Sequence, residues 1–404
     1  MSDSNTSSDQ PSDPSDSGIL GNIAKTASTV SQSHSLTIAS DTSSYRRLMR
    51  FYLQALAREL LPHERVAQCL HALAPRSATV DLMYSPQVKR AHYKGLIVCA
   101  RVWICPVCAS KISERRRVDL SAAIAAWPGS VAMVTYTLRH SADDSLPVIL
   151  GALLGAFRAT KSGRAWQSIA RIYGVGGSVR ALEVTYGRNG WHPHFHELMF
   201  LSPDVDPDAL LDALRVLWLL KLEKQGRDAS WENGVDLQTA NSRVADYVAK
   251  YGRDPVDAGW TLSHEMAKAS TKTSHPDGMT PFQLLLEYGE NIGQGLADEW
   301  PAHKFREYAA AFKGKKQLEW SRGLRDRLGL NDEATDDDLA TEDREDAVWL
   351  ASLTRDQWNI VLGNDVRGQL LDVASAAGAA GNIEPLRQFL AAFGIELQLG
   401  SGQE

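Results

Sequence analysis

Three stretches in the middle of the chain alternate apolar and polar side chains, or are rich in β-branched and aromatic residues, as strands are. These predicted strands are VAMVTYTLRH, SVRALEVTYG and HFHELMFLS, at residues 131–140, 178–187 and 194–202. Arg188, Asn189 and Gly190 join the second strand to the third. Because Asn-Gly is a strong hairpin signal, we expect these two strands to pair antiparallel. A fourth, short strand is predicted at 236–240.

Apolar residues recur at helical spacing before, between and after these strands. Residues 45–75 predict one or two amphipathic helices with a basic polar face, and further helices are predicted at about 144–160, at 206–225 and from Asn241 or Ser242 onward. The resulting order is strand, helix, strand, strand, helix, strand, helix. This order favours an α+β fold in which helices cover one face of an antiparallel sheet.

The chain has 404 residues, of which 44% are hydrophobic and 23% charged, as in soluble globular proteins. Its net charge of −6 hides a basic centre: residues 45–330 carry 38 lysines and arginines against 29 acids, whereas residues 331–404 carry four arginines and fifteen acids. A basic centre suits a polyanion such as nucleic acid, although a solvated surface explains it equally well. We expect neither a membrane span nor a secretion signal, and the four cysteines of a signal-free chain indicate a reducing, cytoplasmic location.

His192, His194 and His196 alternate with Pro193 and Phe195 where the third strand begins, and a period of two places all three imidazoles on one strand face. Three imidazoles crowded together favour a divalent metal site. Glu183 lies on the partner strand of the predicted hairpin, where its oxygen would bias the site toward Mg²⁺ or Mn²⁺. A plain surface carboxylate remains the alternative for Glu183.

Tyr247 and Tyr251 are four residues apart in DYVAKYGRD, so a helix would place both phenols on one face with Lys250 beside them. A tyrosine with an ordinary pKa of about 10 must be activated by a metal or a cation before it acts as a nucleophile. Together with the histidine face, these residues predict phosphoryl chemistry with a tyrosine nucleophile.

Cys99, Cys105 and Cys108 form a C-x5-C-x2-C pattern that resembles part of a structural zinc site. Either Cys69 or His92 could supply the fourth ligand, and free thiols are the alternative. A basic cluster follows, which could contact DNA phosphates or simply face solvent; it comprises Lys111, Arg115, Arg116 and Arg117. No G-x-x-x-x-G-K-[ST] loop is present, so ATP hydrolysis is not indicated.

The ordered set of motifs HPHFH and YVAKY, preceded by VTYTLRH, RALEVT and CPVCASKI and followed by QLEWSRGLR, resembles the HUH endonucleases that initiate rolling-circle replication of small plasmids and circular phages. The resemblance covers about residues 90–330. It implies a five-stranded antiparallel sheet with the metal site on one face, and His194 and His196 as metal ligands.

The same resemblance implies a reaction. Tyr251 would attack a scissile phosphate in single-stranded or supercoiled origin DNA, forming a 5′-phosphotyrosine and freeing a 3′-OH that host polymerase extends. Tyr247 would serve the second strand transfer, Lys250 would stabilise the transferring phosphate, and Arg253 would contact DNA. A host helicase is the further partner that the resemblance implies.

We therefore expect six segments, with the chemistry in the third. They are a disordered tail (1–44), a helical and zinc-binding segment (45–125), the HUH nicking domain (126–255), the C-terminal part of the replication protein (256–330), an acidic linker (331–347) and a small helical appendage (348–404).

Three other functions remain open on the sequence alone. An HUH transposase or relaxase shares the chemistry. A zinc-dependent DNA-binding regulator would need the metal sites without catalysis. A HIT-type nucleotide hydrolase also has alternating histidines, but Glu197 stands where that motif requires an apolar residue.

Overall fold

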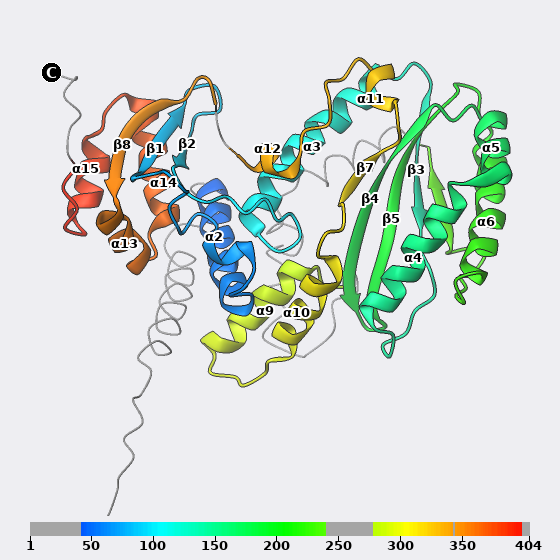
Figure 1. Cartoon of the computed structure of the whole chain (residues 1–404), viewed down its shortest axis with the longest axis horizontal. Helices are drawn as coiled ribbons and strands as arrows, with labels where there is room; N and C mark the ends of the chain where they lie inside the picture. The colour runs from blue at the N-terminus through cyan, green and yellow to red at the C-terminus, as the bar shows by residue number, and fades with distance from the viewer. Residues whose placement is uncertain (1–41, 240–277, 342–343, 398–404) are drawn as a thin grey trace, which may run out of the picture.

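The computed structural model describes residues 42–239, 278–341 and 344–397, and the largest element within them is an antiparallel sheet. Its strands are β3 (Ser130–Tyr136), β4 (Gly177–Gly187), β5 (Gly190–Leu201), β6 (Val235–Gln238) and β7 (Leu318–Trp320). They lie in the order β6-β3-β5-β4-β7, on the right of Figure 1. The predicted α+β class and the five-stranded antiparallel sheet are thereby confirmed. The fifth strand, β7, is too short to leave a periodic pattern in the sequence.

Three helices cover one face of this sheet: α4 (Leu146–Thr160), α5 (Gly163–Ile172) and α6 (Pro207–Glu223). The N-terminus of α6 is fixed by Asp206, whose carboxylate accepts hydrogen bonds from two backbone amides of the first turn. Tyr136 of β3 packs edge-on against Phe157 of α4 and Trp218 of α6. These aromatic contacts hold the helices to the sheet.

The opposite face of the sheet is covered at one end by α3 (Pro106–Ala126). Leu120 and Ala123 of this helix pack in one apolar cluster with Leu198 and Phe200 of β5. Because side chains alternate along a strand, the even-numbered histidines of β5 lie on the same face. The fold thus places α3 beside the histidines.

A second, three-stranded sheet lies apart from the first, on the left of Figure 1, in the order β2-β1-β8. Its strands are β1 (Thr79–Ser85), β2 (Arg90–Lys94) and β8 (Val348–Thr354). The surrounding helices are α2 (Thr42–Leu60), η1 (Arg65–Gln68), α13 (Arg355–Gly363), α14 (Arg367–Ala380) and α15 (Glu384–Ala391). The C-terminal segment, expected to be helical, therefore also contributes a strand that pairs antiparallel with β1.

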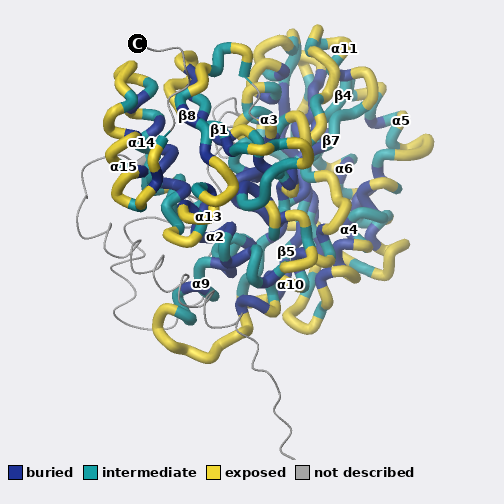
Figure 2. Tube along the Cα trace, turned by 60° about the vertical axis from the view of Figure 1, so that its left-hand side comes forward, coloured by how far each residue is buried: buried dark blue, intermediate teal, exposed yellow. Residues whose placement is uncertain are grey.

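The remaining helices connect the two sheets: α9 (Pro281–Gly293), α10 (Trp300–Phe312), α11 (Leu324–Arg327) and α12 (Asp336–Ala340). Helix α9 contacts α2, and α10 contacts α4. Buried residues consequently run through the centre of both parts, as Figure 2 shows. The expected acidic linker contains α12. Among the described residues, none of the helices combines the length and the apolar character that crossing a bilayer requires.

Two expectations lie outside the described residues. They are most of the expected N-terminal tail, at residues 1–41, and the helix predicted from Asn241 or Ser242.

Candidate functional site

The β4–β5 hairpin positions the histidines. Gly187 pairs with Gly190 across a tight turn, so β5 begins earlier than the sequence pattern predicted and contains all three histidines. Gly190 has a φ of +82°, and a Cβ there would lie 3.0 Å from Ala142 Cα. Glycine is therefore required at this turn. The resulting register pairs Glu183 with His194 and Ala181 with His196.

Glu183, His194 and His196 come together on the sheet face that α3 covers at one end. The Glu183 Oε2 atom lies 3.7 Å from the Nε2 atom of each histidine, and one potential ligand atom from each residue lies within 4.8 Å of the others. The histidine side chains are 12% and 17% exposed, whereas Glu183 is 39% exposed. Two nitrogens and a carboxylate oxygen, open to solvent on one side, can hold a divalent ion and leave positions for substrate.

Hydrogen bonds orient both imidazoles. His194 Nδ1 lies 3.2 Å from the carbonyl oxygen of His192, and since a carbonyl only accepts, this nitrogen carries the proton. His194 Nε2 then faces Glu183. His196 Nδ1 lies 3.0 Å from Thr135 Oγ1 on the neighbouring strand β3. Such outer contacts fix the ring orientation of metal-binding histidines.

His192, the third predicted histidine, is not part of this three-residue group. Its Nδ1 lies 2.8 Å from His140 Nε2, and His140 Nδ1 donates to the Asn189 carbonyl at 2.9 Å. Burial, with the neighbouring imidazoles, lowers the pKa of His192 to about 4. His192 is therefore neutral at physiological pH and packs beside His194 as a support.

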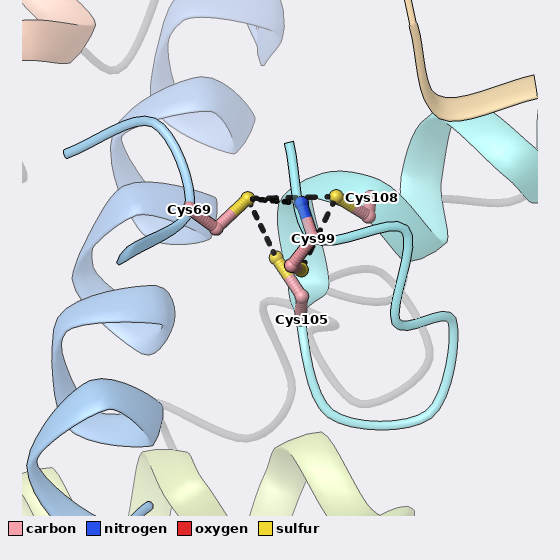
Figure 3. Close-up of side chains that lie close together, drawn as sticks. All are labelled: Cys69, Cys99, Cys105 and Cys108. Carbon is pink, nitrogen blue, oxygen red and sulfur yellow. Dashed lines mark hydrogen bonds between the residues drawn. The ribbon is translucent and has the colours of Figure 1, made fainter. Parts of the chain in front are cut away.

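Cys69, Cys99, Cys105 and Cys108 form a second cluster, which is buried (Figure 3). The Sγ of Cys108 lies 3.6 Å from those of both Cys69 and Cys99, and the Sγ atoms of Cys105 and Cys69 are 3.8 Å apart. A tetrahedral site with Zn–S bonds of about 2.3 Å has sulfur–sulfur distances of about 3.8 Å. All four cysteines are free of disulfides. The donor set and its spacing fit a zinc ion.

The fold also decides between the two candidates for the fourth ligand. Cys69 follows η1 and lies with the other three cysteines, whereas His92 is buried in β2 and is not a member of the cluster. The pKa of the Cys69 thiol is held below its usual range, chiefly by a hydrogen bond from Cys105 and also by bonds from the other two cysteines.

A buried polar network surrounds the cysteines, and sequence patterns did not indicate it. Gln54 Nε2 donates to Cys105 Sγ at 3.3 Å, and Arg367 of α14 donates to Gln54 Oε1 at 3.1 Å and to the Leu70 carbonyl at 2.9 Å. Arg367 is only 2% exposed. Burial lowers its pKa, while Asp365, Tyr93 and the thiols of Cys69 and Cys105 oppose this effect. The C-terminal segment thus places a cation beside the cysteine cluster.

The basic cluster of α3 is engaged within the chain. Arg116 is buried, pairs with Asp336 and donates to Gln317 Oε1 at 3.0 Å. Arg117 pairs with Glu114, and Arg115 donates to the Asp338 carbonyl. Arg116, which was expected to contact DNA, is therefore buried and paired with α12 in this structure.

The predicted nucleophile and its neighbours lie outside the described residues; they are Tyr247, Lys250, Tyr251 and Arg253. Thr135, His140, Gln54 and Arg367 are the site residues that sequence reasoning did not single out. Thr135 and His140 belong to the stretch VTYTLRH, but the sequence analysis did not predict that this strand pairs with the histidine strand. That pairing, which places Thr135 opposite His196, is the information that was missing.

We compared the sequence with known proteins, and it matches the profile of one protein family. The profile of the replication protein family, Rep_1, matches residues 93–361. A curated relative, Protein rep of Streptomyces lividans, is 29% identical over 360 residues, covering 72% of this chain and 77% of the relative. The neomycin resistance protein of Streptomyces cyanogenus is 32% identical over 136 residues, covering 27% of this chain and 31% of the relative. No solved structure matches the chain.

Proposed function

The chain belongs to the replication protein family, and from this premise we propose that it initiates rolling-circle replication by nicking one strand of an origin. The observation that supports the proposal is the cluster of Glu183, His194 and His196, whose ligand atoms converge on one face of the sheet with Glu183 partly exposed. A divalent ion such as Mg²⁺ or Mn²⁺ bound there would polarise a phosphate oxygen and offset its charge. His192 and Thr135 would hold the two histidines in position.

The proposed chemistry is a transesterification. The hydroxyl oxygen of Tyr251 attacks the scissile phosphorus, the new bond is a 5′-phosphotyrosine, and the bond from phosphorus to the 3′-oxygen breaks. The tyrosine proton leaves to solvent or a base, and the 3′-oxygen takes up a proton. A 3′-OH can later attack the phosphotyrosine and rejoin the strand, with Tyr247 serving the second transfer and Lys250 stabilising the transferring phosphate. The assignment of the tyrosines and Lys250 rests on the sequence resemblance.

Host proteins would complete the cycle. The freed 3′-OH needs a host polymerase, and because the sequence has no phosphate-binding loop for ATP, strand separation needs a host helicase. Both requirements favour a reaction in the cytoplasm.

We further propose that the four cysteines hold zinc as a structural ion. Their burial leaves no open coordination position, which is the property that distinguishes structural zinc from catalytic zinc.

The decisive experiment incubates the full chain with Mn²⁺ and single-stranded fragments of its replicon, followed by a denaturing gel. Wild type is compared with Tyr251→Phe, and Tyr247→Phe is the matched control. We expect a metal-dependent covalent adduct that Tyr251→Phe abolishes and Tyr247→Phe retains in the first cleavage. An equal adduct yield from Tyr251→Phe would overturn the assignment of the nucleophile. Binding without cleavage would favour a regulator, and strand transfer between unrelated ends would favour a transposase.

A further inference from the structure

The short acidic helix α12 lies across the basic helix α3 (Figure 1). It begins with three consecutive aspartates. Thr335 and Asp338 close its N-terminus with a reciprocal capping box, and Ala340 at its end is buried. The helix is therefore a defined element with its negative charge held in one place.

Three arginines contact α12. Arg116 pairs with Asp336, Arg115 Nη1 donates to the Asp338 carbonyl at 3.0 Å, and Arg65 Nη2 lies 3.5 Å from Asp337 Oδ1. These are the charge-assisted contacts that arginines make to phosphate oxygens. The acidic helix thus occupies donors that a nucleic-acid backbone would use.

The covered surface adjoins the histidine cluster. Arg116 donates to the side chain of Gln317, whose carbonyl accepts from Leu182, the neighbour of Glu183. The next residue, Leu318, pairs with Ala181, which in turn pairs with His196. A DNA strand that places a phosphate at the cluster would consequently pass close to the surface under α12.

We propose that α12 is an intramolecular substitute for the DNA backbone, and that it must be displaced before α3 can contact phosphates. This inference rests on the proposed function. It explains why an acidic segment lies at this position, because α12 lowers the affinity for DNA that lacks an origin by occupying the basic face. A strand held by its origin contacts can compete locally for the same arginines.

The contacts are suited to displacement. Burial raises the pKa of Asp336 in spite of the adjacent Arg116, which means that desolvation of this carboxylate outweighs the attraction of its partner. The pair between Arg65 and Asp337 is largely exposed, and pairs of that kind contribute little to stability. A polyanion that releases counterions as it binds can therefore replace both carboxylates.

The first test compares two variants of the full chain that change net charge equally. Asp336→Asn with Asp337→Asn removes the two paired carboxylates and keeps the Asp338 cap, whereas Asp332→Asn with Glu333→Gln alters acids of the same segment that precede α12. The probe is a single-stranded oligonucleotide of about 20 nucleotides without an origin, titrated over a range of salt concentrations.

The α12 variant should bind this probe about tenfold more tightly at low salt, and freeing two arginines should steepen the dependence of log K on log salt by about 1.4. Adding Arg116→Gln to the α12 variant should remove part of this gain. The inference fails if the Asp332 and Glu333 control gains equally, or if the α12 variant gains nothing while wild type still binds. A wild type that binds no single-stranded DNA at any salt would overturn the proposed function itself.

A second measurement needs no variant and is unaffected by a folding defect. Saturating wild type with the same oligonucleotide should speed the hydrogen exchange of backbone amides in residues 338–341, because the helix leaves its position. Unchanged exchange in α12 at saturation would overturn the inference.

Discussion

The two clusters of potential metal ligands differ in how the chain builds them. The cysteine cluster gathers Cys69, Cys99 from the segment before α3, and Cys105 and Cys108 at the start of α3; it is fully buried and consists of sulfur alone. The cluster of Glu183, His194 and His196 comes from one hairpin, contains nitrogen and oxygen and is open on one side. A closed thiolate site ties distant segments together, whereas an open site leaves room for substrate. From this difference we expect the cysteine cluster to contribute to stability and the cluster of Glu183, His194 and His196 to serve the proposed chemistry.

The largest effect should follow from Cys108→Ser. Apparent free energies of structural zinc binding are about 10–16 kcal/mol in small peptides, so loss of one buried ligand should remove bound zinc and most of the folding stability. Metal analysis and thermal unfolding of the purified variant measure both. The control is His92→Asn, which should keep one zinc per chain. If Cys108→Ser retained zinc and its melting temperature, the cysteine cluster would not be a metal site.

The next effect concerns activity. His196→Ala should lower the rate of adduct formation about 1,000-fold, or about 4 kcal/mol, because one of two imidazole ligands is lost. Its melting temperature should change less than that of Cys108→Ser, since His196 is only partly buried whereas Cys108 is fully buried. Zinc content is the accompanying control and should stay at the wild-type value. A large fall in melting temperature with activity retained would mean that His196 serves stability and not the proposed chemistry.

A smaller effect is expected for Arg367, which links the cysteine cluster to the C-terminal segment. Arg367→Met leaves Gln54 Oε1 and the Leu70 carbonyl without their donor and should cost about 2–3 kcal/mol of unfolding free energy. Arg367→Lys keeps the charge and should recover part of this loss. Chemical denaturation is measured on zinc-loaded and on chelated protein. The comparison separates the loss of unfolding free energy that depends on the metal from the loss that comes from the hydrogen bonds alone. Equal losses in both states would mean that Arg367 acts independently of the metal.

The smallest effect should come from Thr135→Val, which removes the hydroxyl beside His196 Nδ1 at nearly constant volume. Loss of such an outer contact typically weakens metal binding about 10–100-fold. The Mn²⁺ concentration that gives half-maximal adduct should rise accordingly, while the rate at saturating Mn²⁺ stays close to that of wild type. A changed maximal rate with unchanged Mn²⁺ dependence would contradict an orienting role.

The histidine hairpin could be predicted from patterns among residues that are close together in the sequence. A period of two along β5 and the Asn-Gly turn are properties of neighbouring residues, so the strand pairing and the approach of Glu183 to His194 follow from them. The α+β class followed from the order of such elements.

Long-range contacts could not be predicted in the same way. Neither β1 nor β8 indicates its partner in sequence, and Cys69 and His92 were equivalent until the fold brought only one to the cluster. Arg116 had the charge of a DNA contact, but its burial depends on α12, which lies far along the chain. Such features arise from packing between segments and leave no periodic signal.

The pairing of β1 with β8 also sets the timing of folding. Thr79 pairs with Thr354 and Tyr84 with Val348, so the middle strand of the small sheet keeps one open edge until residues 348–354 have been synthesised. At about 5–20 residues per second the ribosome needs on the order of tens of seconds to supply the partner. During that interval the edge of β1 is exposed to association with other chains. Chain termination before residue 348 would make that exposure permanent. It would also remove Arg367, the cation beside the cysteine cluster.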